Sequence, residues 1–356
     1  MTLARTRRVA TLFGDGRIRP VESEVPALGD GYVMVKTEAS LVSPGTELGG
    51  WRALANRMNS PVDAAPKPFG YSAAGRVIAV EGSEAEEFSV GDRVACIGGG
   101  FALHSDLIVV PHNLCVPLPE NVSASQGAYA MLAATALHEL RRAELRFGEF
   151  FAVVGLGVLG QLCAQFHQLA GQYVIGWDKI DFRVETSMRL GINAGVVVDR
   201  DDEVIKTREF TAGAGLDGAT IAFGGDANSA IKALAATLKK YPDGHPAGVV
   251  TVVGGATFDY ASIEANGLTN TDIRRSARTG FGYHDPVWEI GPAYPPVVMR
   301  WTTRTNLELC MRLIAENRLD VDGLTTHVIP FGRIESDLAA TLVDPDKMLG
   351  VVFSYE

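Results

Sequence analysis

The sequence predicts an α/β protein that combines a mostly-β domain with a doubly wound parallel sheet. Residues 9 to about 120 contain short apolar runs separated by Gly, Pro and charged residues, which is typical of strands and turns. From residue 125 strands alternate with helical patterns, and this spacing predicts a parallel sheet with right-handed crossovers. A chain of 356 residues is long enough for two domains, each with its own core.

The first part of the chain is expected to be rich in strands. Asp15-Gly16 is a hairpin signal, and no helix-length periodic segment appears before Ser123. One long loop carries Ser43-Pro44-Gly45-Thr46-Glu47. The expected strands are Val9–Phe13, Tyr32–Lys36, Gly75–Val80, Arg93–Ile97 and Leu107–Val110.

The second part is expected to alternate strands with helices after a first helix at Ala128–Leu140. Its expected strands are Phe151–Gly155, Tyr173–Asp178, Gly195–Val198, Ala219–Phe223 and Val249–Val253. The helices between them lie near 158–170, 181–190, 202–210 and 227–240.

The last part begins with a long connection, residues 281–301, that is rich in aromatic residues and prolines. We interpret it as a substrate-facing or subunit-facing loop rather than a linker. The elements expected after it are a helix at Asn306–Asn317, the segment Leu324–Pro330, a helix at Glu335–Leu342 and a strand at Leu349–Ser354.

A glycine-rich turn in the second part predicts a dinucleotide site. The apolar run Phe150–Val154 leads into Gly155-Leu156-Gly157-Val158-Leu159-Gly160, and a helical pattern follows. In such a site the first glycine takes a tight turn, the second lets backbone approach a pyrophosphate, and the third lets helix and strand pack closely. The N-terminus of the helix then offers N–H groups and a partial positive charge to the phosphates.

An acidic residue follows at the expected distance, because Asp178 lies 18 positions after Gly160. Its carboxylate would accept hydrogen bonds from an adenosine ribose and repel a 2′-phosphate, so NAD is favoured over NADP. The basic side chains of Lys179 and Arg183 are compatible with NADP as the alternative. The remaining cofactor candidates are Thr135, Phe223-Gly224, Val253-Gly254 and Phe281-Gly282, with plain turn glycines as the alternative for the glycine pairs that follow two strands.

The amino-acid composition argues against several classes of binding partner. The net charge of −10 argues against nucleic acid and anionic membrane, which would need a basic face. The four cysteines form no C-x-x-C, which suggests neither a disulfide framework nor a cysteine-rich zinc lobe and fits a reducing, cytoplasmic setting. No secretory signal pattern follows the N-terminal arginines, and no run approaches the ~18 apolar residues of a membrane span.

Several short motifs resemble those of the medium-chain dehydrogenase/reductase superfamily. They are Gly70-Tyr71-Ser72-Ala73-Ala74-Gly75-Arg76-Val77, Val90-Gly91-Asp92-Arg93-Val94, Val116-Pro117-Leu118-Pro119, Leu324-Thr325-Thr326-His327-Val328-Ile329-Pro330 and Asp344-Pro345-Asp346-Lys347. The resemblance covers essentially the whole chain. It implies a GroES-like catalytic domain at 1–127 and 301–356, a Rossmann domain at 128–300, and a homodimer formed through the sheet edge near Thr271–Thr279. It also places Arg183 against the adenosine, with a solvated helix charge as the alternative.

The sequence departs from this resemblance at the positions of the catalytic zinc ligands. Where zinc-dependent members have Cys-Gly-Thr-Asp, this chain has Pro44-Gly45-Thr46-Glu47, and Tyr71 replaces a histidine. The third ligand falls near Met131. Zinc needs three good N, S or O ligands, which proline, methionine and a neutral tyrosine do not supply. We therefore expect no zinc.

Without a metal, hydrogen-bond donors and a proton-transfer group must activate the substrate oxygen. The resemblance implies Thr46, Tyr71 and His104 as catalytic candidates, with Tyr71 or His104 as the acid/base and Glu47 accepting a hydrogen bond from Tyr71. The alternatives are that Tyr71 fills the vacated zinc site, that His104 is structural or binds substrate, and that Thr46 caps a loop. Ser43, His284 and Arg300 are candidates for substrate contact.

The expected function is a zinc-independent, NAD-dependent oxidoreductase for a secondary alcohol or ketone. The Ser-Pro-Gly-Thr-Glu loop and Gly-Tyr-Ser resemble a branch with bacteriochlorophyllide-type and sugar- or cyclitol-type dehydrogenases, which implies a polar, hydroxylated substrate. An NADPH-dependent quinone or enoyl reductase is the runner-up. A catalytically silent NAD-binding protein is the third reading.

Overall fold

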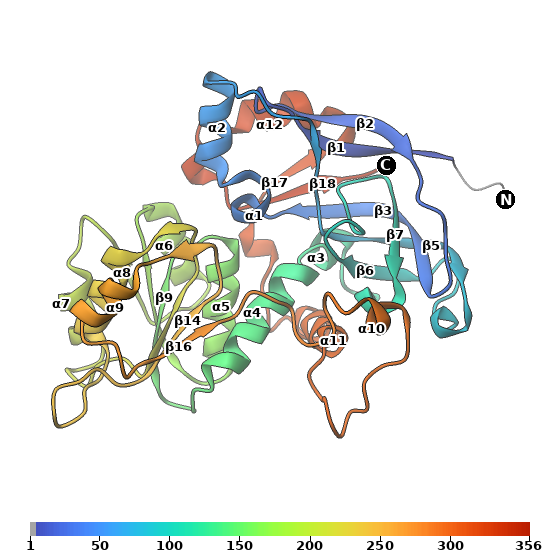
Figure 1. Cartoon of the computed structure of the whole chain (residues 1–356). Coiled ribbons are helices and arrows are strands. Elements are labelled where there is room, and N and C mark those ends of the chain that lie inside the picture. The colour runs from blue at the N-terminus through green and yellow to red at the C-terminus, as the bar shows by residue number, and fades with distance from the viewer. Residues whose placement is uncertain (1–4) are drawn as a thin grey trace. The chain divides into compact units, whose positions relative to one another are not determined.

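The computed structural model describes residues 5–356 and contains two compact units (Figure 1). The first unit comprises the chain up to Ala134 together with Thr279–Glu356, and the second is Thr135–Arg278. The boundaries expected from sequence were 127/128 and 300/301, so the connection 279–300 belongs with the first unit. It is tied there because Asn306 Nδ2 donates to the Thr279 carbonyl at 2.7 Å.

The first unit is built on a mixed seven-stranded sheet with the order β17-β18-β3-β5-β6-β8, in which β7 also pairs with β3. β3 has 11 residues and pairs antiparallel with β5, β7 and β18. The strands are β3 (Tyr32–Val42), β5 (Ser72–Glu81), β6 (Arg93–Ile97), β7 (Leu107–Pro111), β8 (Cys115–Pro117), β17 (Thr325–Pro330) and β18 (Gly350–Ser354).

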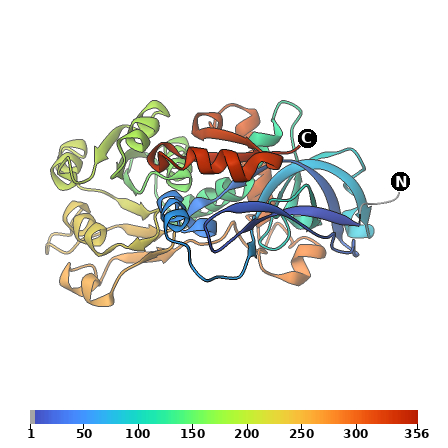
Figure 2. The ribbon, with the colours of Figure 1, turned by 90° about the horizontal axis from the view of Figure 1, so that it is seen from above.

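A smaller three-stranded sheet has the order β2-β1-β4. Figure 2 shows its blue hairpin beside the red C-terminal helix, and Arg19 on β2 pairs with Glu335 on that helix at 2.9 Å. The strands are β1 (Thr6–Leu12), β2 (Ile18–Glu24) and β4 (Lys67–Pro68). The expectation of no helix before Ser123 is wrong, because this region holds α1 (Pro44–Leu48) and α2 (Trp51–Asn59).

α2 forms because its apolar residues are spaced for one helical face. Trp51 and Leu54 are three positions apart and both are buried. They pack in one cluster with Ile334 and Leu338 from α12 (Ile334–Thr341). The segment has only nine residues, and its other side chains mix three apolar with four polar residues, so its amphipathic pattern is short. The long loop expected at Ser43–Glu47 instead contains α1 and leads into this helix.

The other helices of the first unit lie around the sheet. They are α3 (Ala124–Gly127), α10 (Pro286–Ile290), α11 (Thr303–Ala315) and the 3₁₀ turns η1 (Ser83–Ala85), η2 (His112–Leu114), η3 (Asp322–Leu324), η4 (Phe331–Arg333) and η5 (Pro345–Lys347). Asp285 caps the N-terminus of α10, and its carboxylate accepts from the Val287 N–H at 3.1 Å. Its Trp288 is buried, and Asn113 Nδ2 donates to the Trp288 carbonyl at 2.6 Å. The connection 279–300 is therefore folded onto the first unit.

The second unit is a six-stranded parallel sheet with the order β11-β10-β9-β12-β14-β16. This is the doubly wound order in which the chain starts at the centre and reverses between β9 and β12. The strands are β9 (Phe150–Val154), β10 (Tyr173–Asp178), β11 (Ala194–Val197), β12 (Gly218–Ile221), β14 (Val249–Val252) and β16 (Asp272–Arg275), with a short pair β13 (Gly225–Asp226) and β15 (Ala256–Thr257) beyond it.

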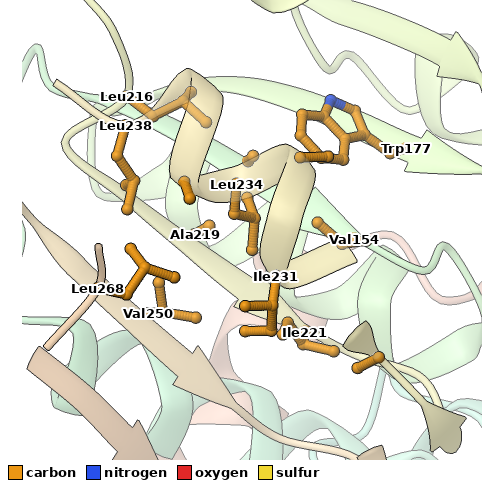
Figure 3. Packing of buried hydrophobic residues seen from close by; sticks show 14 of the residues in the cluster. Val154, Trp177, Leu216, Ala219, Ile221, Ile231, Leu234, Leu238, Val250 and Leu268 are labelled. Carbon is orange, nitrogen blue, oxygen red and sulfur yellow. The ribbon is translucent and has the colours of Figure 1, made fainter. Parts of the chain in front are cut away.

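Helices alternate with these strands as expected. They are α4 (Ala130–Ala143), which continues across the boundary from the first unit, α5 (Val158–Leu169), α6 (Asp181–Arg189), α7 (Glu203–Phe210), α8 (Asn228–Thr237) and α9 (Tyr260–Ala265). Figure 3 shows Ile231 and Leu234 of α8 packed against Ala219 and Val250 of the sheet. The edge strand β16 lies at the sheet edge that the resemblance implied, but the apolar pattern did not indicate it, because Asp272-Ile273-Arg274-Arg275 contains one apolar residue and no buried face. Among residues 5–356 no helix is both long and apolar enough to cross a bilayer.

Candidate active site and cofactor site

The glycine-rich turn joins β9 to α5 in the second unit, and its three glycines differ in what surrounds them. Gly155 has a φ of +95°, which favours glycine. A Cβ on Gly160 would overlap the Gly155 carbonyl oxygen, so a side chain there would force the helix away from the strand. A Cβ on Gly157 would have no atom within 4 Å. The turn therefore leaves open space over Gly157, at the N-terminus of a 12-residue helix, which fits a pyrophosphate.

Asp178 ends β10 beside this turn. Its Oδ2 accepts from the Leu156 N–H at 2.7 Å and its Oδ1 accepts from the Ile180 N–H at 2.8 Å. The side chain is 7% exposed. Because each carboxylate oxygen has two lone-pair directions, each can still accept a hydroxyl. The glycine turn and the acidic residue are thus joined by a hydrogen bond, as a ribose–pyrophosphate site requires.

The two basic candidates near Asp178 differ. Lys179 is exposed and pairs with Asp199 at 3.1 Å. Arg183 is less exposed, and its Nη1 lies 3.7 Å from Asp178 Oδ2. Its Nε is buried and has no hydrogen-bond partner within residues 5–356. Arg183 therefore lies against Asp178, whereas Lys179 is a surface charge.

The remaining cofactor candidates divide between the units. In the second unit, a Cβ on Gly254 would lie 2.5 Å from the Phe223 carbonyl oxygen, so the chain after β14 runs close to the chain after β12. The other candidates there are Gly224, Val253 and Thr135, of which Val253 and Thr135 are buried. Phe281 and Gly282 belong to the first unit. Phe281 is exposed, and a Cβ on Gly282 would overlap the Trp288 ring.

The first unit gathers four of the sequence-derived candidates around α1. Pro44 begins this one-turn helix after Ser43. Glu47 turns back, and its Oε2 accepts from the Ser43 N–H at 2.7 Å. The Glu47 side chain is 3% exposed, and its Oε1 has no hydrogen-bond partner within the described chain. A buried carboxylate oxygen without a partner is costly and points to a ligand or a proton.

Tyr71 faces this turn. Burial raises the pKa of its phenol, the nearby Glu47 carboxylate raises it further, and hydrogen bonds with the Ser43 and Thr46 side chains act in the opposite direction. Gly98 N–H donates to the Tyr71 carbonyl at 3.0 Å and holds the backbone. The phenol is therefore protonated at neutral pH and is a hydrogen-bond donor.

His104 lies behind Glu47 and is fully buried. Its Nε2 lies 3.3 Å from Glu47 Oε2, and its Nδ1 lies 2.8 Å from Ser40 Oγ. The rings of Phe69 and Phe353 pack edge-on against it. Both ring nitrogens are occupied, so this geometry favours a positioning role for His104 over direct contact with substrate.

The connection 279–300 adds a tyrosine that the sequence did not single out. Tyr283 is buried, its hydroxyl accepts from the Gly99 N–H at 3.1 Å, and its proximity adds a smaller electrostatic contribution that raises the pKa of Tyr71. Its ring packs on His284 with centroids 3.9 Å apart. The cluster of aromatic residues in this connection was the available signal. Arg300 is exposed and lies over the Trp301 ring, 4.6 Å from its centroid.

The positions that would carry zinc ligands hold no metal-binding set. Tyr71 is surrounded by hydroxyls, and the Met131 N–H donates to Ser72 Oγ at 3.2 Å. Within residues 5–356, no three side chains of His, Cys, Asp or Glu lie close enough together to hold a metal ion.

Known proteins with similar sequences include several dehydrogenases. No protein-family model matches the chain. A zinc-type alcohol dehydrogenase-like protein of Haemophilus influenzae is 26% identical over 54% of this chain and 62% of its own length. A similar protein of Escherichia coli is 22% identical over 92% of both chains. The D-guloside 3-dehydrogenase of Escherichia coli is 26% identical over 71% of this chain and 67% of its own. The chain thus spans less than two thirds of the first of these relatives.

Solved structures share the fold over nearly the full chain. An Escherichia coli oxidoreductase/dehydrogenase of unknown specificity has a TM-score of 0.75, with 17% identity and 99% of both chains covered. An Escherichia coli alcohol dehydrogenase in complex with NADH has a TM-score of 0.71, with 16% identity and 99% and 100% coverage. A zinc-binding dehydrogenase of Sinorhizobium meliloti bound to NADP has 0.69, with 16% identity and 99% and 100% coverage.

The fold and motifs above, together with these relatives, are similar to those of the medium-chain dehydrogenase/reductase superfamily. The expected fold is confirmed: the first unit is its GroES-like domain and the second its Rossmann domain. The relatives also include a sorbitol dehydrogenase of Bombyx mori and an (R,R)-butanediol dehydrogenase of Bacillus subtilis.

Proposed function

We propose that this protein is a nicotinamide-dependent oxidoreductase that interconverts a secondary alcohol and a ketone without zinc, on a polar, hydroxylated substrate. The observation that carries the proposal is the cluster of Ser43, Thr46, Glu47 and Tyr71, which we call the Tyr71 cluster. Its hydrogen-bonding groups occupy the place where the zinc-dependent members of the resembled family hold their metal. The D-guloside 3-dehydrogenase relative acts on a sugar derivative, which supports the choice of substrate class.

The cofactor would be held by the second unit. Gly157 leaves space for the pyrophosphate at the N-terminus of α5, and Asp178 would accept from the ribose hydroxyls. The negative carboxylate favours NAD, and Arg183 lies 3.7 Å from it. The bound nicotinamide supplies or accepts the hydride. Neighbouring structures were solved with NADH and with NADP, which supports a cofactor of this class.

Side chains of the protein transfer the proton and orient the substrate oxygen. The Tyr71 phenol, kept protonated by its raised pKa, donates a hydrogen bond to the substrate oxygen, and Thr46 orients that oxygen. When a ketone is reduced, the substrate oxygen takes the proton of this phenol and leaves a phenolate; in the reverse direction that phenolate takes the proton of the alcohol. The buried Glu47 Oε1 accepts a neighbouring substrate hydroxyl or the released proton.

Two measurements test the proposal. Metal analysis of the purified protein should give substoichiometric zinc, and full zinc occupancy would overturn it. A panel of polyols and sugars with NAD should contain a substrate, whereas reduction of activated double bonds with NADPH would instead indicate a quinone or enoyl reductase. Tight NAD binding with no turnover on either panel would indicate the catalytically silent protein.

A homodimer through the sheet edge at Thr271–Thr279 and a cytoplasmic location stay predictions. β16 is an edge strand of its sheet with an unpaired side, which is compatible with pairing to a second copy. Sedimentation of the purified protein tests the first of these.

A further inference from the structure

We propose that a buried chain of four side chains carries the reaction's proton between the Tyr71 cluster and the surface, ending at Tyr355. The proposal rests on the proposed function, because an alcohol–ketone conversion must release or take up one proton. The four groups are Glu47, His104, Ser40 and Tyr355.

Each neighbouring pair in this chain is within hydrogen-bonding distance. Glu47 Oε2 lies 3.3 Å from His104 Nε2, and His104 Nδ1 lies 2.8 Å from Ser40 Oγ. Ser40 Oγ lies 2.9 Å from the Tyr355 hydroxyl. His104 and Ser40 are fully buried, whereas Tyr355 is partly exposed beside the C-terminus. The four side chains therefore run from the partnerless Glu47 Oε1 to a residue that is partly exposed.

In every hydrogen bond between these four side chains, the donor and the acceptor can exchange roles. In one arrangement Tyr355 donates to Ser40, Ser40 donates to Nδ1, and Nε2–H donates to Glu47. In the other arrangement protonated Glu47 donates to Nε2, Nδ1–H donates to Ser40, and Ser40 donates to Tyr355. Passing one proton along the chain converts one arrangement into the other, because a hydroxyl and a neutral imidazole each donate and accept. No atom is gained or lost except the proton exchanged at each end.

The surroundings of Tyr355, the last of the four side chains, keep its phenol neutral. Burial raises the pKa of the Tyr355 phenol, while its contact with Ser40 lowers it; the carboxylates of Asp106 and Glu47 raise it, and Arg8 lowers it. Around His104, apart from Ser40, the packed groups are the Phe69 and Phe353 rings and the Glu47 carboxylate. Tyr355 thus passes a proton as a neutral hydroxyl and never needs to become a phenolate.

A merely structural role would explain the same contacts, so the test must separate the two. Tyr355→Phe removes only the outer hydroxyl, and the ring can keep its stacking on Phe331. Tyr129→Phe is the matched control, because its hydroxyl also bonds a hydroxyl, Thr325 Oγ1, at 2.7 Å in the same unit but outside the chain. Ser40→Ala interrupts the chain in its middle.

The first measurement uses the full protein, NAD and an alcohol substrate. Ser40→Ala should lower kcat by about 10²-fold, the low end for loss of general acid–base catalysis, and Tyr355→Phe by less. Both should increase the solvent deuterium isotope effect and be partly rescued by added imidazole, whereas Tyr129→Phe should match the wild type. An unchanged isotope effect with no rescue in both variants overturns the proposal while leaving the oxidoreductase function intact.

The second measurement needs no turnover. The ring N–H of buried His104 should exchange its hydrogen with water through Tyr355, so NMR should show slower exchange in Tyr355→Phe. If the contacts were only structural, removing a hydrogen bond would loosen the site and speed the exchange. Faster or unchanged exchange overturns the proposal even if the protein proves to have no alcohol substrate.

Discussion

The glycine turn of the second unit and the Tyr71 cluster of the first unit are both candidate sites, but they are encoded differently. The turn is local: Gly155, Gly157 and Gly160 lie within six residues, and Asp178 follows on the next strand. The cluster combines α1 with Tyr71 and the distant Tyr283. A site formed by backbone in one turn can be predicted from the spacing of its residues. A site formed by side chains from distant segments becomes visible only in the three-dimensional structure.

The largest effect is expected from the substitution that removes the proposed acid/base group of the first unit. Tyr71→Phe should lower kcat by about 10²–10⁴-fold, the usual contribution of a positioned acid/base group, while the affinity for NAD changes little. Steady-state kinetics and NADH fluorescence titration measure the two quantities. A variant that keeps near-normal turnover would show that Tyr71 only fills space.

The second prediction separates two glycines of the same turn. Gly160→Ala should lower the free energy of unfolding by about 1–3 kcal/mol, because its Cβ would overlap the Gly155 carbonyl. Gly157→Ala should leave stability nearly unchanged, because its Cβ meets nothing within 4 Å, and should weaken NADH binding instead. Urea denaturation and fluorescence titration on both variants test this contrast. Equal stability losses would mean that the space over Gly157 is not a ligand site.

The third prediction concerns cofactor choice. Asp178→Asn removes the negative charge and one of two acceptors that hold Leu156 and Ile180. Hydrogen bonds to charged groups are worth about 1.5–3 kcal/mol, so NAD affinity should fall by roughly tenfold or more. NADP affinity should fall less, because repulsion of the 2′-phosphate is relieved and Arg183 remains. Dissociation constants for both cofactors test it, and an unchanged ratio contradicts it.

The smallest expected effect is on alkaline stability. Burial raises the pKa of Tyr71 above that of an unfolded tyrosine, about 10. The folded state therefore holds this proton more tightly, and the stabilisation is present below pH ~10 and lost as the pH rises above it. Tyr71→Phe should make the free energy of unfolding fall less steeply above pH ~10. Denaturation at a series of alkaline pH values measures this, and identical slopes would show that the phenol is not shielded.

Much of the fold could be predicted from the sequence, because its strands and longer helices carry clear apolar periods. α2 and β16 were missed for opposite reasons: α2 is too short for its amphipathic pattern to stand out, and β16 is a polar edge strand held by its neighbour alone. In the first-unit site, one helical turn brings Glu47 back to Ser43. The partner of His104 could not be predicted, because Ser40 lies 64 residues away.

The first unit is assembled from segments on both sides of the second unit in the sequence. Residues 39–42 of β3 pair with β18, whereas β7 pairs with residues 32–36 of β3. During synthesis on the ribosome, residues 39–42 therefore have no β18 partner until the whole intervening second unit has been made. The second unit is able to fold first, whereas the sheet of the first unit is completed only when β18 emerges.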